Sequence, residues 1–562
     1  HSTRRRDRDV PLRRIEIEGF RGIRRMTLDL DETTTLIGEN SCGKTSVLDA
    51  LELVFGHRGA QPAFSPLDFH LPVGTAAPVE RIAMRFTFSA DGGRETVAEL
   101  TAARTPDGSP APATARLTDR EGRDLAPGDE EAVASFRRRH PVLRVRFNRP
   151  PRPAPPGLEP EDASSPDETS APAVPAIGGG GEGEVTRKLR RTVESAYRKF
   201  SGSWRPHPEE LREPIAAARA LAERWIERLR LAPRAPGGRT TEILAETPVL
   251  LGGTNPLRTE SREGTGMQSL ALLMLLGAVL DAENGSPVEA GAEPLVLIEE
   301  AEAHLHPILA ARVFGLIDRV AGQKILTTNS GDLLASVPLH AIRRLVRNGG
   351  GVAVHGLAEG ALTVDEMRRV GYHIRVNRAS SVFARCWLLV EGETESWLLP
   401  EIARLIGYDL PAEGVRCVEF AQCGIAPLVK MARGLGIEWH LLADGDDAGR
   451  HYVRAARSFL QGEPDRERVT GFRERDVEHH LWGAGYAGVY RAAAQRAGML
   501  PSLFGRRRIP TTAIIDRALK AHGKPRMALE VAEAMAAPDS PGVPRLLASV
   551  VEKTVRLARF ST

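Results

Sequence analysis

Hydrophobic and polar residues near the start of the chain alternate as they do in β-strands. Residues 13–20 and 82–88 show this alternation, and residues 34–37 form a short run with β-branched side chains. Residues 46–55 instead repeat their apolar positions with helical spacing. The pattern therefore predicts strands that lead into a helix, with the glycine-containing residues 38–45 between them.

The pattern changes further along the chain. Residues 150–183 are rich in Pro, Gly, Ala and Ser and lose hydrophobic periodicity, which predicts a linker or a disordered loop. Residues 186–232 regain helical spacing, and we interpret them as a helical insertion that forms either a dimerisation arm or a plain packed hairpin. Residues 240–360 and 387–480 resume strand–helix alternation, and the remaining tail is mostly helical in its spacing.

Length and composition restrict the class of protein. A chain of 562 residues is too long for one hydrophobic core, and its 42% hydrophobic and 27% charged residues are ordinary for a globular protein. A net charge of +3 gives no sign of nucleic-acid binding, and the four cysteines lack zinc-ligand spacing. No signal peptide or membrane-spanning run is evident, so we expect reduced thiols, no membrane contact and a cytoplasmic location.

Residues 38–45 match the phosphate-loop pattern G-x-x-x-x-G-K-[ST] between a predicted strand and a predicted helix. In such a loop, backbone N–H groups converge on phosphate oxygens, the lysine reaches the β- and γ-phosphates, and the hydroxyl ligates Mg²⁺. We therefore predict a nucleoside triphosphate site, with Thr45 as a magnesium ligand. The expected contacts come from Gly38, Asn40, Gly43, Lys44, Thr45 and Ser46.

A second apolar run, residues 295–298, ends in two carboxylates. Glu299 is expected to bind Mg²⁺ through water, and Glu300 to act as the base that orients the attacking water. Before this run, Gly266 stands at the start of a long apolar helix, where backbone N–H groups can bind a γ-phosphate from another subunit. In this order the motifs resemble the ATP-binding cassette ATPases of DNA repair, which sandwich ATP between two heads.

The chain departs from that family at two places. No signature serine is evident near Gly264 or Thr265, and Asn329 replaces the expected switch histidine. Asparagine can hydrogen-bond a γ-phosphate but carries no positive charge. We therefore expect slow ATP hydrolysis, or control by ATP binding alone.

Carboxylates also gather at the ends of two later predicted strands. Glu391 and Glu395 lie one helical turn apart after residues 387–390, and Asp444 and Asp446 follow the next such run. Clustered carboxylates repel one another unless a divalent cation neutralises them, and hard oxygen ligands favour Mg²⁺ or Mn²⁺. The pattern predicts a metal site suited to phosphodiester hydrolysis.

The two acidic motifs resemble the Toprim fold of topoisomerases, primases and certain nucleases. A cassette ATPase followed by Toprim resembles the OLD (overcoming lysogenization defect) family of ATP-dependent endonucleases, and residues 19–23 and 66–69 resemble an uncharacterised bacterial subgroup of it. The resemblance implies a further acid at Glu478 and a lysine near the scissile phosphate at Lys524. A surface acid and a helix-end cation are the respective alternatives.

The resemblance implies an α/β fold in which an ABC-type ATPase head with a helical insertion precedes a Toprim (Rossmann-like) domain and a helical C-terminal segment. The boundaries that we predict are 1–150 and 239–375 for the two lobes of the ATPase, 151–185 for the linker, 186–238 for the insertion, 376–484 for the Toprim domain and 485–562 for the helical segment that completes it.

The resemblance further implies an ATP-binding DNA endonuclease that uses Mg²⁺ or Mn²⁺, forms homodimers and acts in phage defence or DNA repair, with a defence-system protein as a further partner. The residues expected to act in catalysis are Glu391, Asp444, Asp446, Lys524 and Glu300. A non-catalytic DNA-binding clamp with a vestigial metal site and an ATPase that assembles partners are the alternatives. A topoisomerase would need a placed nucleophilic tyrosine and a primase usually a zinc module, and neither is evident.

Overall fold

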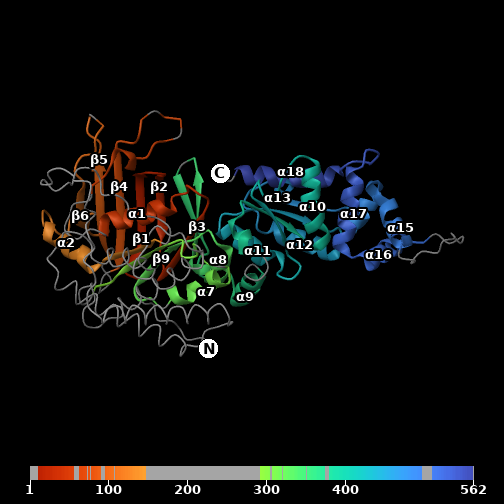
Figure 1. Ribbon diagram of the computed structural model, residues 1–562, viewed down its shortest axis with the longest axis horizontal. Helices are drawn as coiled ribbons and strands as arrows, with labels where there is room; N and C mark the ends of the chain where they lie inside the picture. Colours follow the sequence, from red (N-terminus) through yellow and green to blue (C-terminus); the bar gives the residue numbers. More distant parts are fainter. Residues whose placement is uncertain are drawn as a thin grey trace, which may run out of the picture. The chain divides into compact units, whose positions relative to one another are not determined.

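The computed structural model describes residues 10–55, 63–146, 292–373, 379–496 and 509–560, with short gaps at 73, 76, 90–94, 107, 304, 306, 319 and 350. The chain forms two compact units, His1–Val337 and Pro338–Thr562 (Figure 1). The predicted linker at 151–185, the predicted insertion at 186–238 and Gly266 lie outside the described residues. The domain boundary that we placed between residues 375 and 376 stays a prediction.

The first unit contains an antiparallel sheet with the strand order β2-β1-β4-β5-β6. In its central pair, Ile15 lies opposite Phe86 and Ile17 lies opposite Met84, and all four side chains are buried. The alternation expected from the sequence therefore places one face of these strands in the core. The strands are β1 (Leu12–Phe20), β2 (Ile23–Asp29), β4 (Arg81–Ser89), β5 (Glu95–Ala103) and β6 (Thr114–Thr118).

A second set of strands in this unit runs parallel, in the order β3-β9-β8-β7. Because the carboxyl ends of parallel strands meet at one edge, Gly38, Glu299 and Thr327 come to the same side of the sheet. The strands are β3 (Thr33–Gly38), β7 (Val142–Arg146), β8 (Leu295–Glu299) and β9 (Gln323–Thr327). The helices are α1 (Lys44–Phe55), η1 (Pro66–Asp68), α2 (Glu130–Arg139), α7 (Pro307–Ile317) and α8 (Gly331–Ser336).

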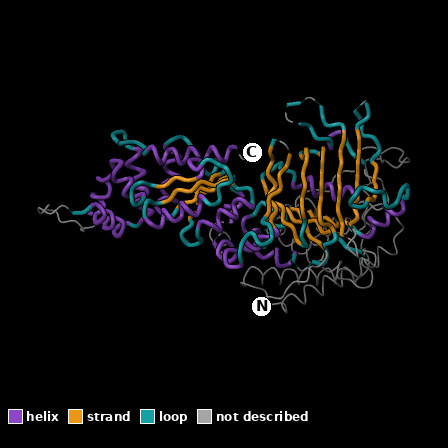
Figure 2. The backbone as a smooth tube through the Cα atoms, turned by 180° about the vertical axis from the view of Figure 1, so that it is seen from behind, coloured by secondary structure: helices purple, strands orange, loops and turns teal. Residues whose placement is uncertain are grey.

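The second unit is built around a four-stranded parallel sheet with the order β13-β12-β14-β15. Figure 2 shows its strands among helices. The strands are β12 (Cys386–Val390), β13 (Val415–Glu419), β14 (Glu438–Ala443) and β15 (Val469–Gly471). The helices that follow them are α10 (Glu393–Leu405), α11 (Ile425–Gly434), α12 (Asp447–Arg457), α13 (Asp465–Arg468) and α14 (Val477–Leu481).

The tail of the chain is helical, as the sequence predicts. Side chains of its last helix, including Leu547 and Val551, join the same buried cluster as Leu388 and Val390 of β12. The tail therefore completes the core of the parallel sheet. Its helices are η6 (Trp482–Tyr486), α15 (Ala487–Arg496), α16 (Thr511–His522), α17 (Lys524–Ala536) and α18 (Arg545–Phe560).

A β-hairpin precedes this sheet within the second unit, and a buried arginine ties the two together. Arg344 donates hydrogen bonds to the carbonyl oxygens of Leu435, Gly436 and Ala384. The elements before the sheet are η3 (Leu339–Ala341), β10 (Ile342–Asn348), β11 (Gly351–Gly356), α9 (Val364–Tyr372) and η5 (Ala379–Phe383). Among the described residues, no helix has the length and apolarity needed to cross a membrane.

Candidate functional sites

The predicted phosphate loop joins β3 to α1. Gly43 has a φ of 101°, and a side chain there would bring its Cβ to 2.9 Å from Ile23, so both its backbone conformation and its surroundings require glycine. The Lys44 Nζ donates to the carbonyl oxygens of Gly38 at 2.5 Å and Glu39 at 3.1 Å. The ammonium group therefore lies folded against the loop that would receive a phosphate.

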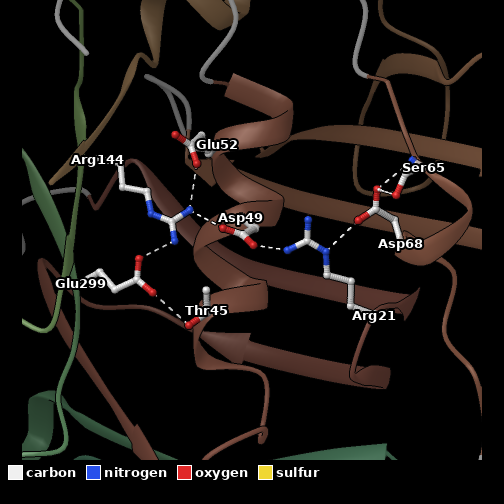
Figure 3. A network of polar contacts seen from close by, with 8 residues as sticks. All are labelled: Arg21, Thr45, Asp49, Glu52, Ser65, Asp68, Arg144 and Glu299. Carbon is white, nitrogen blue, oxygen red and sulfur yellow. Dashed lines mark hydrogen bonds and ion pairs between the residues drawn. The ribbon is translucent and has the colours of Figure 1, made fainter. Parts of the chain in front are cut away.

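The structure brings Thr45 and Glu299 together although 254 residues separate them in the chain. The Thr45 hydroxyl donates to Glu299 Oε1 at 3.0 Å. The other oxygen of Glu299 accepts a hydrogen bond from Arg144 at 2.7 Å (Figure 3). Two residues predicted to take part in magnesium binding thus lie side by side, at the end of β8 and the start of α1.

Glu300 and Asn329 also lie in contact. The Asn329 side-chain amide donates to Glu300 Oε1 at 3.2 Å, and its backbone N–H donates to Glu302 at 2.9 Å. Glu300 has a φ of 52°, in the left-handed region that non-glycine residues seldom adopt. Such strain is found at functional sites more often than elsewhere. The functions expected of Glu300 as a base and of Asn329 as a phosphate ligand stay predictions.

The second site forms where two neighbouring parallel strands end. Glu391 directly follows β12 and Asp444 directly follows β14. Glu391 Oε2 and Asp444 Oδ1 are both buried and have no hydrogen-bond partner. Burial, followed by repulsion from Glu395 and Glu391, raises the pKa of Asp444 to about 8. Two carboxylate oxygens of the site therefore have no hydrogen-bond donor to offset their burial.

The remaining predicted acids join the same cluster. Burial raises the pKa of Glu395 to about 7, and Glu478 adds to this by repulsion. Glu478 is itself buried and accepts a hydrogen bond from Thr394 at 2.8 Å. Asp446 caps α12 by accepting from the Gly449 N–H at 2.7 Å, and its charge helps to raise the pKa of Glu391, after burial.

Lys524 supplies a positive charge that acts on three of these acids. It is the first residue of α17, and its ammonium opposes the rise in pKa that burial causes in Glu391, Glu395 and Glu478. The acids predicted for this site thus lie close enough to affect one another's pKa values. Their individual functions stay predictions.

The glycines of the second acidic motif are required by close backbone packing. A Cβ at Gly445 would overlap with the carbonyl oxygen of Glu474, and one at Gly449 would overlap with that of Asp444. The Gly445 N–H donates to the Arg475 carbonyl at 3.1 Å, which holds the two segments together. This packing fixes the backbone between Asp444 and Asp446 and in the first turn of the helix that follows.

The composition of the cluster fits a divalent cation, because it offers several hard oxygen atoms, two of them without partners. In the described residues, no three Asp, Glu, His or Cys side chains already converge closely enough to hold an ion. A cation would therefore have to draw the carboxylates inward.

Sequence reasoning missed two groups of residues. Asp476 raises the pKa of Asp444, after burial, Glu395 and Glu391, and its carboxylate also binds His479, which in turn contacts Thr512. The proximity of Asp476 to Glu478 in the sequence was the available signal. Arg144 was also missed, because an arginine within a short strand gives no sign of a partner 155 residues away.

Together, the fold and the sites define a class of protein in which a unit with a phosphate-loop motif is followed by a Toprim domain, and the sequence predicts both features. The chain belongs to the family described as protein of unknown function (DUF2813), which matches residues 10–105 and 113–381. Residues 382–446 match the TOPRIM domain of proteins like the overcoming lysogenization defect protein. The predicted OLD-like Toprim domain is thus confirmed.

Individual proteins resemble this chain over different lengths. The uncharacterized protein YbjD of Escherichia coli (strain K12) is 33% identical over 591 residues, which cover 98% of this chain and 99% of that protein. The C-terminal region of the Burkholderia pseudomallei OLD protein is 21% identical, with a TM-score of 0.26, over 31% of this chain and 98% of that one. The SMC head domain from Thermotoga maritima is 14% identical, with a TM-score of 0.31, over 62% and 100%.

Proposed function

We propose that this protein is an ATP-binding, metal-dependent DNA endonuclease in which the ABC-type head regulates the Toprim phosphodiesterase. The observation that supports this most strongly is a group of predicted acids, which lie at the ends of β12 and β14 and in α10 and α14. Two of their carboxylate oxygens are buried and have no hydrogen-bond partner. Burying several carboxylates together costs stability, and a divalent cation bound to a phosphodiester would offset that cost.

In this proposal, Glu391, Asp444 and Asp446 hold the first cation, and Glu395 and Glu478 complete the shell of a second. When bound, Mg²⁺ or Mn²⁺ supplies an activated water and stabilises the leaving oxygen. Lys524 offsets the negative charge that develops on the phosphate. Its exposed position at the start of α17 leaves it accessible to a nucleic-acid backbone.

The ATPase head acts as the control element in this proposal. Lys44 would bind the phosphates of ATP and Thr45 its Mg²⁺, Glu299 would bind that cation through water, Glu300 would orient the attacking water, and Asn329 would hydrogen-bond the γ-phosphate. Gly266 of a second copy closes the site, so the active form is a homodimer. We propose phage defence or DNA repair as the setting, with DNA as the substrate and a defence-system protein as a further partner.

Cleavage of supercoiled plasmid in Mn²⁺ or Mg²⁺, with and without ATP, tests the proposal. Asp444→Asn should reduce the nicking rate by about 100-fold or more, because it removes one charged ligand without changing its shape. Asp447→Asn is the matched control, since that neighbouring side chain is fully exposed. Nicking by Asp444→Asn at the rate of the unmodified chain would sink the site assignment.

A DNA-binding clamp with a vestigial Toprim site is the second candidate. It is favoured by the hydrogen bonds that Asp446 and Glu478 already make to Gly449 and Thr394, and by the lack of a preformed shell among the described residues. DNA binding that depends on ATP, without nicking in any divalent metal, would support this function over the nuclease.

A further inference from the structure

A buried arginine connects the two halves of the candidate nucleotide site. The Arg144 side chain is only 2% exposed and extends from β7. One of its terminal nitrogens donates to Glu299 at 2.7 Å, and the other donates to Asp49 and, at 2.9 Å, to Glu52 (Figure 3). Because Asp49 and Glu52 belong to α1, one guanidinium group links the helix of the phosphate loop to the end of β8.

These contacts fix the direction of the hydrogen bond that Thr45 makes. A guanidinium can only donate, so Glu299 Oε2 accepts a hydrogen bond from Arg144, while Oε1 accepts one from the Thr45 hydroxyl at 3.0 Å. Thr45 thus directs its hydrogen to Glu299, and its oxygen keeps its lone pairs for a cation. An arginine fork suits this arrangement, since its planar donors can bind several carboxylates at fixed angles.

The same network extends to the motifs at residues 19–23 and 66–69, whose function the sequence did not explain. Arg21 donates to Asp49 and, at 2.7 Å, to Asp68. Asp68 in turn accepts from the Ser65 N–H at 2.8 Å and closes the η1 turn. Burial alone would raise the pKa of Asp49, but Arg144 and Arg21 together hold that pKa below its usual value. Asp49 is therefore fixed from both sides.

We propose that Arg144 is a positioning residue for magnesium-dependent nucleotide binding, which holds Glu299 on the Thr45 hydroxyl and both of them against α1. The inference rests on the proposed binding of ATP. It adds a residue whose effect should depend on Mg²⁺, since Arg144 contacts Glu299, which in turn accepts from Thr45, and Arg144 is outside the phosphate loop itself.

Titration of the full chain with ATP, once with Mg²⁺ and once with EDTA, separates the magnesium-dependent part of the affinity from the part that needs no cation. The unmodified chain should bind ATP more tightly with Mg²⁺. Arg144→Met keeps the apolar stem and should lose about tenfold or more of that magnesium-dependent gain, with less than about a twofold change in EDTA. The magnesium-dependent gain of Arg144→Lys should lie between those of the unmodified chain and Arg144→Met, because an ammonium supplies charge but no planar fork. Arg123→Met, which removes an exposed ion pair with Asp119, is the control.

A double-mutant cycle keeps the proposal testable if Arg144→Met fails to fold. The magnesium-dependent gain is measured in Arg144→Lys, in Glu299→Gln and in the double variant, and thermal unfolding verifies each fold. Non-additive losses are expected, because both changes act on one contact. Additive losses, or equal weakening in Mg²⁺ and EDTA, would overturn the positioning function alone. Absence of ATP binding by the unmodified chain would overturn the proposed nucleotide binding together with it.

Discussion

Single carboxylates in the second unit lie in surroundings that disfavour their charge. Asp444 is the clearest case, because burial and the nearby Glu395 and Glu391 raise its pKa to about 8. Lys524, the predicted cation of the site, lies on the exposed end of a helix, and Asp444 keeps an oxygen without a hydrogen-bond donor. Ionising this group in the metal-free protein therefore costs folding free energy.

We predict that the metal-free chain loses stability as the pH rises from about pH 5 to about pH 8. Asp444 and Glu395, with pKa values raised to about 8 and about 7, keep protons in the folded state that they release when unfolded. Their ionisation on raising the pH thus opposes folding. The free energy of unfolding should fall by about 1–3 kcal/mol. This is less than the full pKa shifts of the two groups imply, because solvent screens the partly exposed Asp444.

Thermal unfolding in EDTA across this pH range measures the effect. Asp444→Asn should flatten the dependence, whereas the exposed Asp447→Asn should leave it unchanged. Added Mn²⁺ should reverse the loss at the alkaline end, because a cation stabilises the ionised carboxylates. Glu395 should keep part of the slope in Asp444→Asn, so a slope as steep as that of the unmodified chain contradicts the assignment of the titration to Asp444.

The residues that the sequence could predict are those that occur in short motifs. Lys44 and Thr45 share one loop, and Glu391 and Asp444 each end an apolar run, so local pattern was sufficient to find them. Arg144 and Asp49 have no such local pattern. Their pairing depends on β7 lying next to β8 and on the position of α1, which only the folded chain shows.

At the scale of elements, the sequence predicted which segments form strands or helices better than it predicted which elements contact one another. The alternation of β1 and β4 and the helical tail were both evident from spacing. The contact of the η1 turn with Arg21 could not be foreseen, because it joins residues 47 positions apart without any periodic signal. Hydrophobic periodicity reports which face of an element is buried and carries no information about which element covers it.

The β10–β11 hairpin supplies an element-scale prediction. Arg344→Met should lower the free energy of unfolding by about 2–4 kcal/mol, because the carbonyl oxygens of Leu435, Gly436 and Ala384 all lose a buried charged donor. Chemical denaturation of the full chain measures this change. Arg368→Met, at an exposed position of α9, should change it by less than about 0.5 kcal/mol, and equal losses in the two variants would argue against the buried contacts as the cause.

At the scale of the whole molecule, two compact units predict two responses to ligands. ATP with Mg²⁺ at about 100 times its dissociation constant should stabilise the first unit by about 2.7 kcal/mol, and Lys44→Ala should remove this gain. Mn²⁺ alone should stabilise the second unit both in the unmodified chain and in Lys44→Ala. Calorimetric unfolding with each ligand separates the transitions. Loss of the Mn²⁺ response in Lys44→Ala would show that the cation acts through the ATPase head.

The packing of α18 against the core of the Toprim domain limits which segments of the gene can be exchanged between relatives without loss of the fold. The sequence that carries the recognisable Toprim signature ends at residue 446, yet Leu547 and Val551 of α18 lie in the same buried cluster as β12. A gene fragment encoding only the signature would expose the apolar surface that α18 covers. Recombination between relatives should therefore preserve the segment as far as Phe560 as one inherited block, with its termini more than 170 residues apart.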